Sequence, residues 1–185
     1  TVTFVIGGRQ IGGTQARLSA EGPDDVLSFS SLAVRGAGLG SITVGDVSTI
    51  DRYGQGCAGS NGKAPTLFAL EPVRMGARTT FRLQDALAGS AARVMIGISR
   101  DSMGGIPLPL DLGQIGAPGC SLLNSIDADL PCRVDTAGSC EAMLAMPVLA
   151  GFEGAGLWFQ GLVLDPRANS AGFVATGGIE TAIMR

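Results

Sequence analysis

The stretch YGQGCAGSNGKAPTL, which begins at Tyr53, has the spacing that most strongly suggests chemistry. Gly54, Gly56 and Gly59 form G-x-G-x-x-G, the pattern of dinucleotide-binding loops. Such a loop needs a helix directly behind it, because the helix N-terminus receives the pyrophosphate. A further glycine and Pro65 follow here, and both disfavour a helix. We therefore do not expect dinucleotide binding.

The same stretch also departs from the phosphate-binding pattern G-x-x-x-x-G-K-[ST]. Cys57 stands where this pattern requires its first glycine, and Ala64 stands where Ser or Thr would bind magnesium. We interpret the glycines as residues that let the backbone turn tightly around Cys57.

The cysteines form an even set: Cys57, Cys120, Cys132 and Cys140. No C-x-x-C spacing suggests zinc binding or thioredoxin-like chemistry. Of the three possible connectivities, Cys132 with Cys140 and Cys57 with Cys120 is the most economical, because a turn-rich segment separates the last two cysteines. Disulfides persist in oxidising compartments, so the set favours secretion. The alternative is four reduced thiols in a cytosolic protein.

The chain contains no histidine, so conventional Ser-His-Asp and Cys-His sites and His-ligated metals are excluded. Carboxylate-only or lysine-based enzymes stay open as a third alternative, but we predict a protein that is not an enzyme. The formal net charge is −3, Lys63 is the only lysine and the arginines are scattered. Nucleic-acid binding is not expected, because it requires a basic patch.

We expect no cofactor. Calcium stays open as an alternative, because two groups of residues could supply oxygen ligands. Asp127, Asp129 and Asp135 form one group, and Asp165 with Asn169 forms the other. Neither has the D-x-D-x-D-G pattern followed by a distant Glu. We interpret them as turn residues that bond to local backbone.

Trp158 and Tyr53 are aromatic residues that could stack on a sugar. A lone Trp inside the apolar run LWFQGLVL is more typical of a core position. Trp158 is therefore a possible ligand contact with a simpler structural explanation.

Short β-prone segments separated by Gly, Pro, Asn and Asp predict an all-β fold, an antiparallel β-sandwich of jelly-roll or Ig-like type with little helix. Single helical turns are expected only at 84–91 and 147–152. No apolar run is long enough to span a bilayer. The predicted strands are 1–6, 16–20, 26–34, 41–50, 66–70, 78–83, 93–99, 120–126, 140–146, 157–164, 173–176 and 179–184.

A change in composition near Tyr53 divides the chain. Residues 1–52 form a glycine-rich N-terminal segment without cysteine, and residues 53–185 contain all four cysteines. We expect residues 53–185 to form the sandwich domain and residues 1–52 to supply an assembly strand and added strands.

Ordered motifs from Tyr53 onward resemble a secreted β-rich domain that is common at the C-terminal ends of planctomycete and myxobacterial extracellular proteins. The motifs are YGQGCAGS at 53–60, PTL at 65–67, IGIS at 96–99, GIPLPLDL at 105–112, GAPGC at 116–120, FQ at 159–160, LDP at 164–166, AN at 168–169 and TGGIE at 176–180. The resemblance implies an extracellular β-domain in which Cys57 and Cys120 are the recurrent pair. It implies no catalytic residues, and Cys132 with Cys140 is an addition to its pattern.

These observations predict an extracellular structural subunit that self-assembles into a filament, sheath or bacterial surface layer. The feature behind this hypothesis is Thr1–Ile6, a β-prone strand tethered by glycine pairs. Val2, Phe4 and Ile6 lie on one face of that strand and could be buried at a neighbour's sheet edge, giving a homo-oligomer or homopolymer. The simpler interpretation of Thr1–Ile6 is the first strand of its own sandwich, and assembly could then use other surfaces. The competing hypothesis is an adhesion or carbohydrate-binding module that recognises cell-surface polysaccharide.

Overall fold

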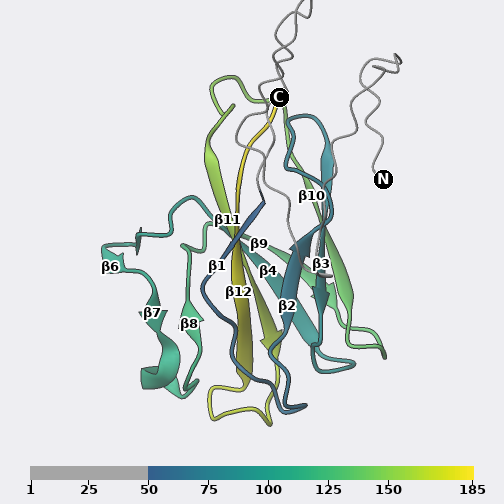
Figure 1. Cartoon of the computed structure of the whole chain (residues 1–185), viewed down its shortest axis with the longest axis vertical. Coiled ribbons are helices and arrows are strands. Elements are labelled where there is room, and N and C mark those ends of the chain that lie inside the picture. Colours follow the sequence, from purple (N-terminus) through teal and green to yellow (C-terminus); the bar gives the residue numbers. More distant parts are fainter. Residues whose placement is uncertain (1–49) are drawn as a thin grey trace, which may run out of the picture. The chain divides into compact units, whose positions relative to one another are not determined.

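A computed structural model describes residues 50–185, which lie within one compact unit, Ser48–Arg185. These residues form β-strands and one short 3₁₀ helix, η1 (Leu112–Ile115). All ladders between the strands are antiparallel, and two main sheets pack face to face (Figure 1). The expected all-β fold with antiparallel sheets is confirmed.

The two main sheets differ in width. The large sheet has five strands in the order β1 (Asp51–Tyr53), β12 (Phe173–Ala182), β11 (Gly156–Leu164), β4 (Ala91–Gly97) and β9 (Ala128–Arg133). The small sheet has three strands in the order β10 (Cys140–Ala145), β3 (Arg78–Gln84) and β2 (Thr66–Ala69). β1 and β9 are therefore the edge strands of the large sheet, and β10 and β2 are those of the small sheet.

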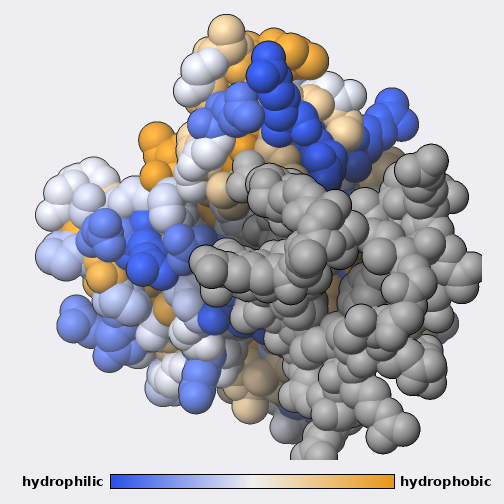
Figure 2. Space-filling model, turned by 45° about the horizontal axis from the view of Figure 1, so that its top comes forward, coloured by the Kyte–Doolittle hydropathy of each residue, from blue (hydrophilic) through white to orange (hydrophobic). Residues whose placement is uncertain are grey.

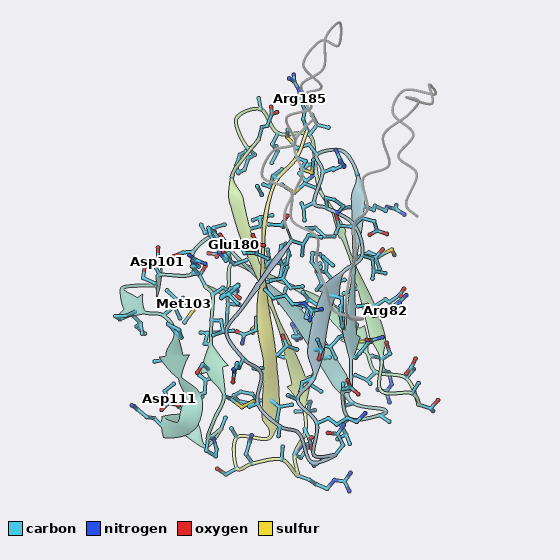
Figure 3. All side chains as sticks on the ribbon, in the orientation of Figure 1. Arg82, Asp101, Met103, Asp111, Glu180 and Arg185 are labelled. Carbon is cyan, nitrogen blue, oxygen red and sulfur yellow. A yellow bond between two sulfur atoms is a disulfide. The ribbon has the colours of Figure 1, made fainter. Side chains whose placement is uncertain are left out.

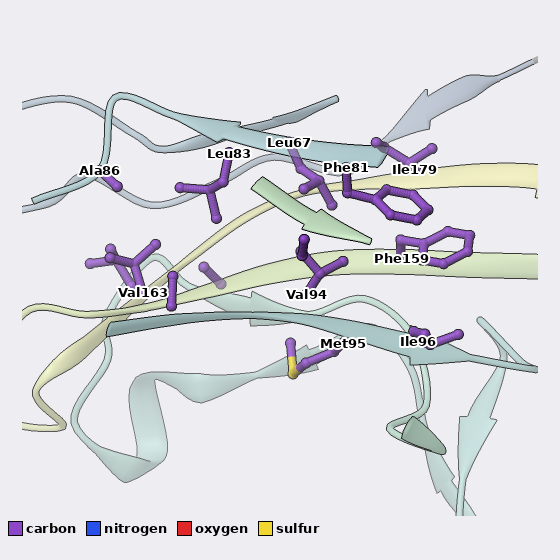
Figure 4. Close-up of a cluster of buried hydrophobic side chains, with 14 of the residues drawn as sticks. Leu67, Phe81, Leu83, Ala86, Val94, Met95, Ile96, Phe159, Val163 and Ile179 are labelled. Atoms are coloured by element: carbon purple, nitrogen blue, oxygen red, sulfur yellow. The ribbon is translucent and has the colours of Figure 1, made fainter. Parts of the chain in front are cut away.

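Alternating side chains fill the space between the sheets. Phe81 of β3 and Phe159 of β11 are fully buried, with ring centroids 4.4 Å apart. Leu83, Val94 and Ile179 pack in the same cluster (Figure 4). The strict alternation of β3, in which every second residue is buried, follows from the period of two in a strand.

Residues 98–127, called the flap from here on, connect β4 to β9 and contact the outer face of the large sheet. They contain η1 and the short strands β5 (Ser102–Met103), β6 (Ile106–Pro107), β7 (Leu110–Asp111) and β8 (Ser121–Leu122). β6, β7 and β8 lie beside the sandwich in Figure 1. Asp111 caps η1 by accepting the Gly113 amide hydrogen, and Gly116 ends it with φ 93°.

The two expected disulfides are present. Cys132 of β9 is joined to Cys140 of β10, with Cα atoms 5.9 Å apart, so this bond links edge strands of opposite sheets. Cys57 follows β1 and is joined to Cys120 in the flap, with Cα atoms 4.9 Å apart. One disulfide therefore ties the two sheets together, and the other ties the flap to the sandwich.

Several expected elements differ in the structure. Neither 84–91 nor 147–152 is helical; η1 lies instead in the flap. Only Ser121–Leu122 of the expected strand 120–126 is a strand, because the following residues turn towards buried polar partners. The predicted strands 1–6, 16–20 and 26–34, and nearly all of 41–50, lie outside the described residues.

β12 joins the two expected strands 173–176 and 179–184 into one. The glycines that suggested a break serve close packing, because a Cβ at Gly178 would lie 2.4 Å from the Tyr53 ring. Tyr53 itself belongs to β1, which pairs with β12 across the predicted domain boundary. Residues 51 and 52 are therefore part of the sandwich.

Candidate functional site

Residues 54–65, called the Cys57 loop from here on, close onto the side chain of Asp165. The Ser60 amide donates to Asp165 Oδ2 at 2.7 Å, and the Arg167 amide donates to Oδ1 at 3.3 Å. Asp165 is buried, with 1% of its surface exposed. A Cβ at Gly59 would lie 3.0 Å from this carboxylate, so the close approach favours glycine. The residues after Gly59 form turns and an extended segment, with no helix to receive a pyrophosphate.

Two opposing effects act on the pKa of Asp165. Burial raises it, but the amide hydrogen bonds from Ser60 and Arg167, together with the charge of Arg167, outweigh burial and leave the pKa below its ordinary value. The ionised carboxylate is thus the form that holds the Cys57 loop closed.

Cys57 anchors the other side of its loop. The Cys57 amide donates to the carbonyl of Ala175 in β12 at 3.0 Å, and the Ala175 amide lies 3.2 Å from the Cys57 sulfur. The disulfide then continues to Cys120, which is 1% exposed. This arrangement joins the Cys57 loop, β12 and the flap, and we interpret it as a structural fastening.

A buried polar cluster fixes the flap on the large sheet. Gln160 of β11 is fully buried; it accepts the Leu123 amide hydrogen at 3.0 Å and donates to the carbonyls of Ser121 and Thr176, each at 2.9 Å. Tyr53 donates to Asn124 Oδ1 at 3.4 Å. The cluster satisfies the polar groups that the flap buries, as a low-dielectric site requires.

The pKa of Tyr53 is raised well above its ordinary value. Burial is the largest cause, Glu180 adds to it, and Arg100 opposes it. The Arg100 guanidinium lies 5.9 Å from the centre of the Tyr53 ring and pairs with Glu180 at 2.7 Å. Glu180 lies on β12 on the side of the molecule that carries Met103 of the flap (Figure 3).

Trp158 is half-buried beside this group. Its direct neighbours across the large sheet are Gly97 and Glu180, and its ring lies against Gly156. The Nε1 atom is enclosed and has no hydrogen-bond partner. Trp158 therefore serves mainly as packing beneath surface charges, with part of the ring left accessible.

The residues for which calcium binding is the open alternative are engaged in separate roles. Asp127 accepts from the Ile98 amide at 2.9 Å and from the Ser125 hydroxyl at 2.6 Å, while Asp129 pairs with Arg93. Asp135 accepts from the Ala137 and Ser139 amides, each at 2.9 Å, in the turn between β9 and β10. Asn169 donates to the Phe173 carbonyl. Within residues 50–185, no three acidic or cysteine side chains gather as a metal site.

The strand edges differ in the groups they offer to another strand. Directly after β10, the Met146 amide donates to the Ala77 carbonyl, so the alternation along the strand directs the main-chain groups of Glu141, Met143 and Ala145 away from β3. Directly after β9, the Val134 amide donates to the Ser90 carbonyl, and the same alternation directs the main chain of Pro131 outward. The β10 edge therefore presents amide donors, whereas the β9 edge presents a proline at its centre.

The expected assembly residues Val2, Phe4 and Ile6 lie outside the described residues, so their role stays a prediction. Sequence reasoning missed Gln160 and Pro131. A glutamine within an apolar strand gives no signal of its hydrogen-bond partners. Pro131, with the charged residues Asp129 and Arg133 two positions to either side, could have indicated an edge strand.

The chain matches no protein-family model, no curated protein and no solved structure in comparisons with each. The resemblance carried by the motifs from Tyr53 onward therefore stays a prediction. Several of its residues nevertheless meet in space: Cys57, Cys120, Ser60 and Asp165 hold the fastening described above. No helix within residues 50–185 is long and apolar enough to cross a membrane.

Proposed function

We propose that this chain is a non-catalytic extracellular structural subunit that self-assembles into a filament, sheath or surface layer through exchange of its N-terminal strand. The observation that carries the proposal is a disulfide-tied sandwich whose small sheet ends in β10, a strand with outward-facing main-chain groups that no other strand of residues 50–185 uses. An exposed edge of this kind is a template for a strand from another chain. The disulfides support an oxidising, extracellular setting.

Thr1–Ile6 is the strand that would be exchanged. Burying Val2, Phe4 and Ile6 would contribute about 5 kcal/mol before the cost of ordering the segment. Each subunit would then offer one strand and receive one, which is a head-to-tail contact. A head-to-tail contact that does not close into a ring produces an open filament.

Size-exclusion chromatography and negative-stain microscopy test the proposal. The full chain is expected to form filaments or sheets, and the chain lacking residues 1–13 is expected to remain monomeric. A full-length variant with Val2, Phe4 and Ile6 replaced by Ser separates loss of the apolar face from loss of length. A full chain that stays monomeric at high concentration would refute self-assembly.

The second candidate is an adhesion module for cell-surface polysaccharide. The partly accessible Trp158 side chain, opposite Glu180 and its partner Arg100, favours it, because carbohydrate sites combine an aromatic platform with charged hydrogen-bonding groups. Trp158→Ala should abolish binding on a glycan array if this is the function. Phe152→Ala is the matched control, since Phe152 is 47% exposed and lies in the loop between β10 and β11.

A further inference from the structure

We propose that β10 is the acceptor edge for Thr1–Ile6 of a second copy of this chain, and that β9 is closed to it. This inference rests on the proposed function, because it names the surface at which the subunits would join. It follows from comparing the edge strands that residues 50–185 present: β1, β2, β9 and β10.

β9 cannot act as an acceptor along its length. Pro131 occupies the central outward-facing position and has no amide hydrogen to donate. Asp129 and Arg133 are the outward-facing residues on either side of it, and both are charged. Proline and charge are the features by which proteins protect strand edges from further pairing.

β1 and β2 offer too little edge. β1 has three residues and β2 has four, against the six of β10. The Arg52 guanidinium lies 4.3 Å from the centre of the Phe68 ring, so a side chain from β1 already covers part of β2. Beyond β2, Met184 near the end of the chain bonds to the main chain of Val73 and Met75.

β10 combines an edge of six residues with outward-facing main-chain groups that no other strand of residues 50–185 uses. It is as long as Thr1–Ile6, and its outward-facing residues are Glu141, Met143 and Ala145, all of which have amide hydrogens. Glu141 pairs with Arg82 across the ladder to β3, and Arg82 projects away from the small sheet (Figure 3). This ion pair leaves the main-chain edge free.

Residues 50–185 leave the core partly uncovered between the edge strands β9 and β10. Leu130 of β9 and Leu144 of β10 are only half-buried, although both pack against the buried core. Beside β10, the apolar face of an added strand would cover these leucines, as every second residue of a strand points inward. Met143 lies on the solvent-facing side of β10 and is 62% exposed, so side chains on the other face of the added strand could contact it. The Cys132–Cys140 disulfide keeps the two edge strands together before any partner arrives.

Two variants of the full chain test the assignment. Met143→Pro removes an outward-facing amide that β3 does not use, so it should block acceptance and leave donation intact. Phe4→Asp should block donation and leave acceptance intact. Each variant alone should be monomeric, and an equimolar mixture should give discrete dimers without filaments. Asp129→Pro, placed on the β9 edge, is the matched control and should assemble like the unmodified chain.

Hydrogen exchange gives a readout that needs no substitution. In the assembled protein, the amides of Glu141, Met143 and Ala145 should exchange at least tenfold more slowly than in monomers, while those of Asp129 and Arg133 should be unchanged. Filaments of the unmodified chain without this protection, or filaments formed by folded Met143→Pro, would overturn the β10 assignment and leave self-assembly standing. An unmodified chain that never assembles would instead refute the proposed function itself.

Discussion

Asp165 shows how much a single carboxylate can organise. It accepts amide hydrogens from Ser60 and Arg167, and so it holds a loop that is distant in sequence. The cysteines could be paired from the sequence because their number and spacing leave few options. Asp165 was interpreted as a local turn residue or a calcium ligand, because the sequence does not reveal that its partner lies in the Cys57 loop.

Asp165→Asn is expected to destabilise the chain by about 1–3 kcal/mol, because one amide hydrogen bond to a buried charge is lost or poorly replaced. The folded-state pKa of Asp165 lies below its unfolded value, so the carboxylate stabilises the fold above the unfolded pKa. That contribution is lost as the pH falls through the folded pKa. Urea denaturation of both proteins between pH 7 and pH 2 measures the difference.

Asp135→Asn is the control for this substitution. Asp135 also accepts two amide hydrogens, but it is exposed in a turn. Its replacement should change the free energy of unfolding by less than about 1 kcal/mol. Equal losses in the two variants, or an Asp165→Asn loss that persists unchanged at low pH, would contradict the role given to Asp165.

Tyr53 is the only tyrosine, so the absorbance of tyrosinate at 295 nm reports on this one side chain. We expect it to remain protonated well above pH 10 in the folded chain, because burial and Glu180 disfavour the phenolate. The raised pKa stabilises the fold below the unfolded pKa, and this contribution is lost as the pH rises above it. Fluorescence of the single tryptophan, Trp158, shows whether the chain is still folded. Titration near pH 10 in a folded chain would show that Tyr53 is solvated.

The strands differ in how well the sequence predicts them. β3 alternates cleanly and β11 is a long apolar run, so both were predicted to within one or two residues. The sequence does not predict β9, because Asp129 and Pro131 are typical of a turn, whereas an edge strand tolerates both. The flap could not be predicted, since it is held by Gln160 and by glycines whose partners are remote in sequence.

Gly97→Ala is expected to loosen the flap. A Cβ at this position would lie 2.5 Å from the Ser125 carbonyl oxygen and 2.8 Å from Asn124 Nδ2, so the flap backbone must move. Overpacking of this kind costs about 1–3 kcal/mol. Thermal unfolding should show the loss, and hydrogen exchange should locate it in residues 121–127.

Ile98→Ala is the neighbouring control. Ile98 is 67% exposed, so its truncation should alter the free energy of unfolding by less than about 0.5 kcal/mol. Equal free energies of unfolding for the two variants would show that a Cβ at position 97 does not strain the flap.

At the scale of the whole molecule, composition and turn spacing predicted an all-β, disulfide-tied fold, but not which strands pair. The order β1-β12-β11-β4-β9 joins segments far apart in the chain, and local pattern cannot encode such partners. Exposed hydrophobic residues are mixed with hydrophilic ones on the surface drawn in Figure 2. Val148, Leu149 and Phe152 are among the exposed residues and share the loop between β10 and β11.

The two disulfides should contribute unequally to stability. Cys57–Cys120 spans 63 residues and Cys132–Cys140 spans 8. By loop-closure entropy, replacing the first pair with Ser should cost about 4 kcal/mol and replacing the second about 2–3 kcal/mol. Urea denaturation of the two double variants measures which disulfide contributes more to the free energy of unfolding. A larger loss from the Cys132–Cys140 pair would mean that joining the sheets matters more than constraining the unfolded chain.

The Cys57–Cys120 bond also makes a covalent ring of everything between those residues. The whole part of the flap that precedes β8 is inside the ring, including the exposed Arg100. A protease that cuts the backbone once anywhere in the ring opens it without releasing a piece, because the disulfide still joins the two halves. If the chain forms the proposed extracellular assembly, a single backbone cut in the ring would therefore leave the subunit in place.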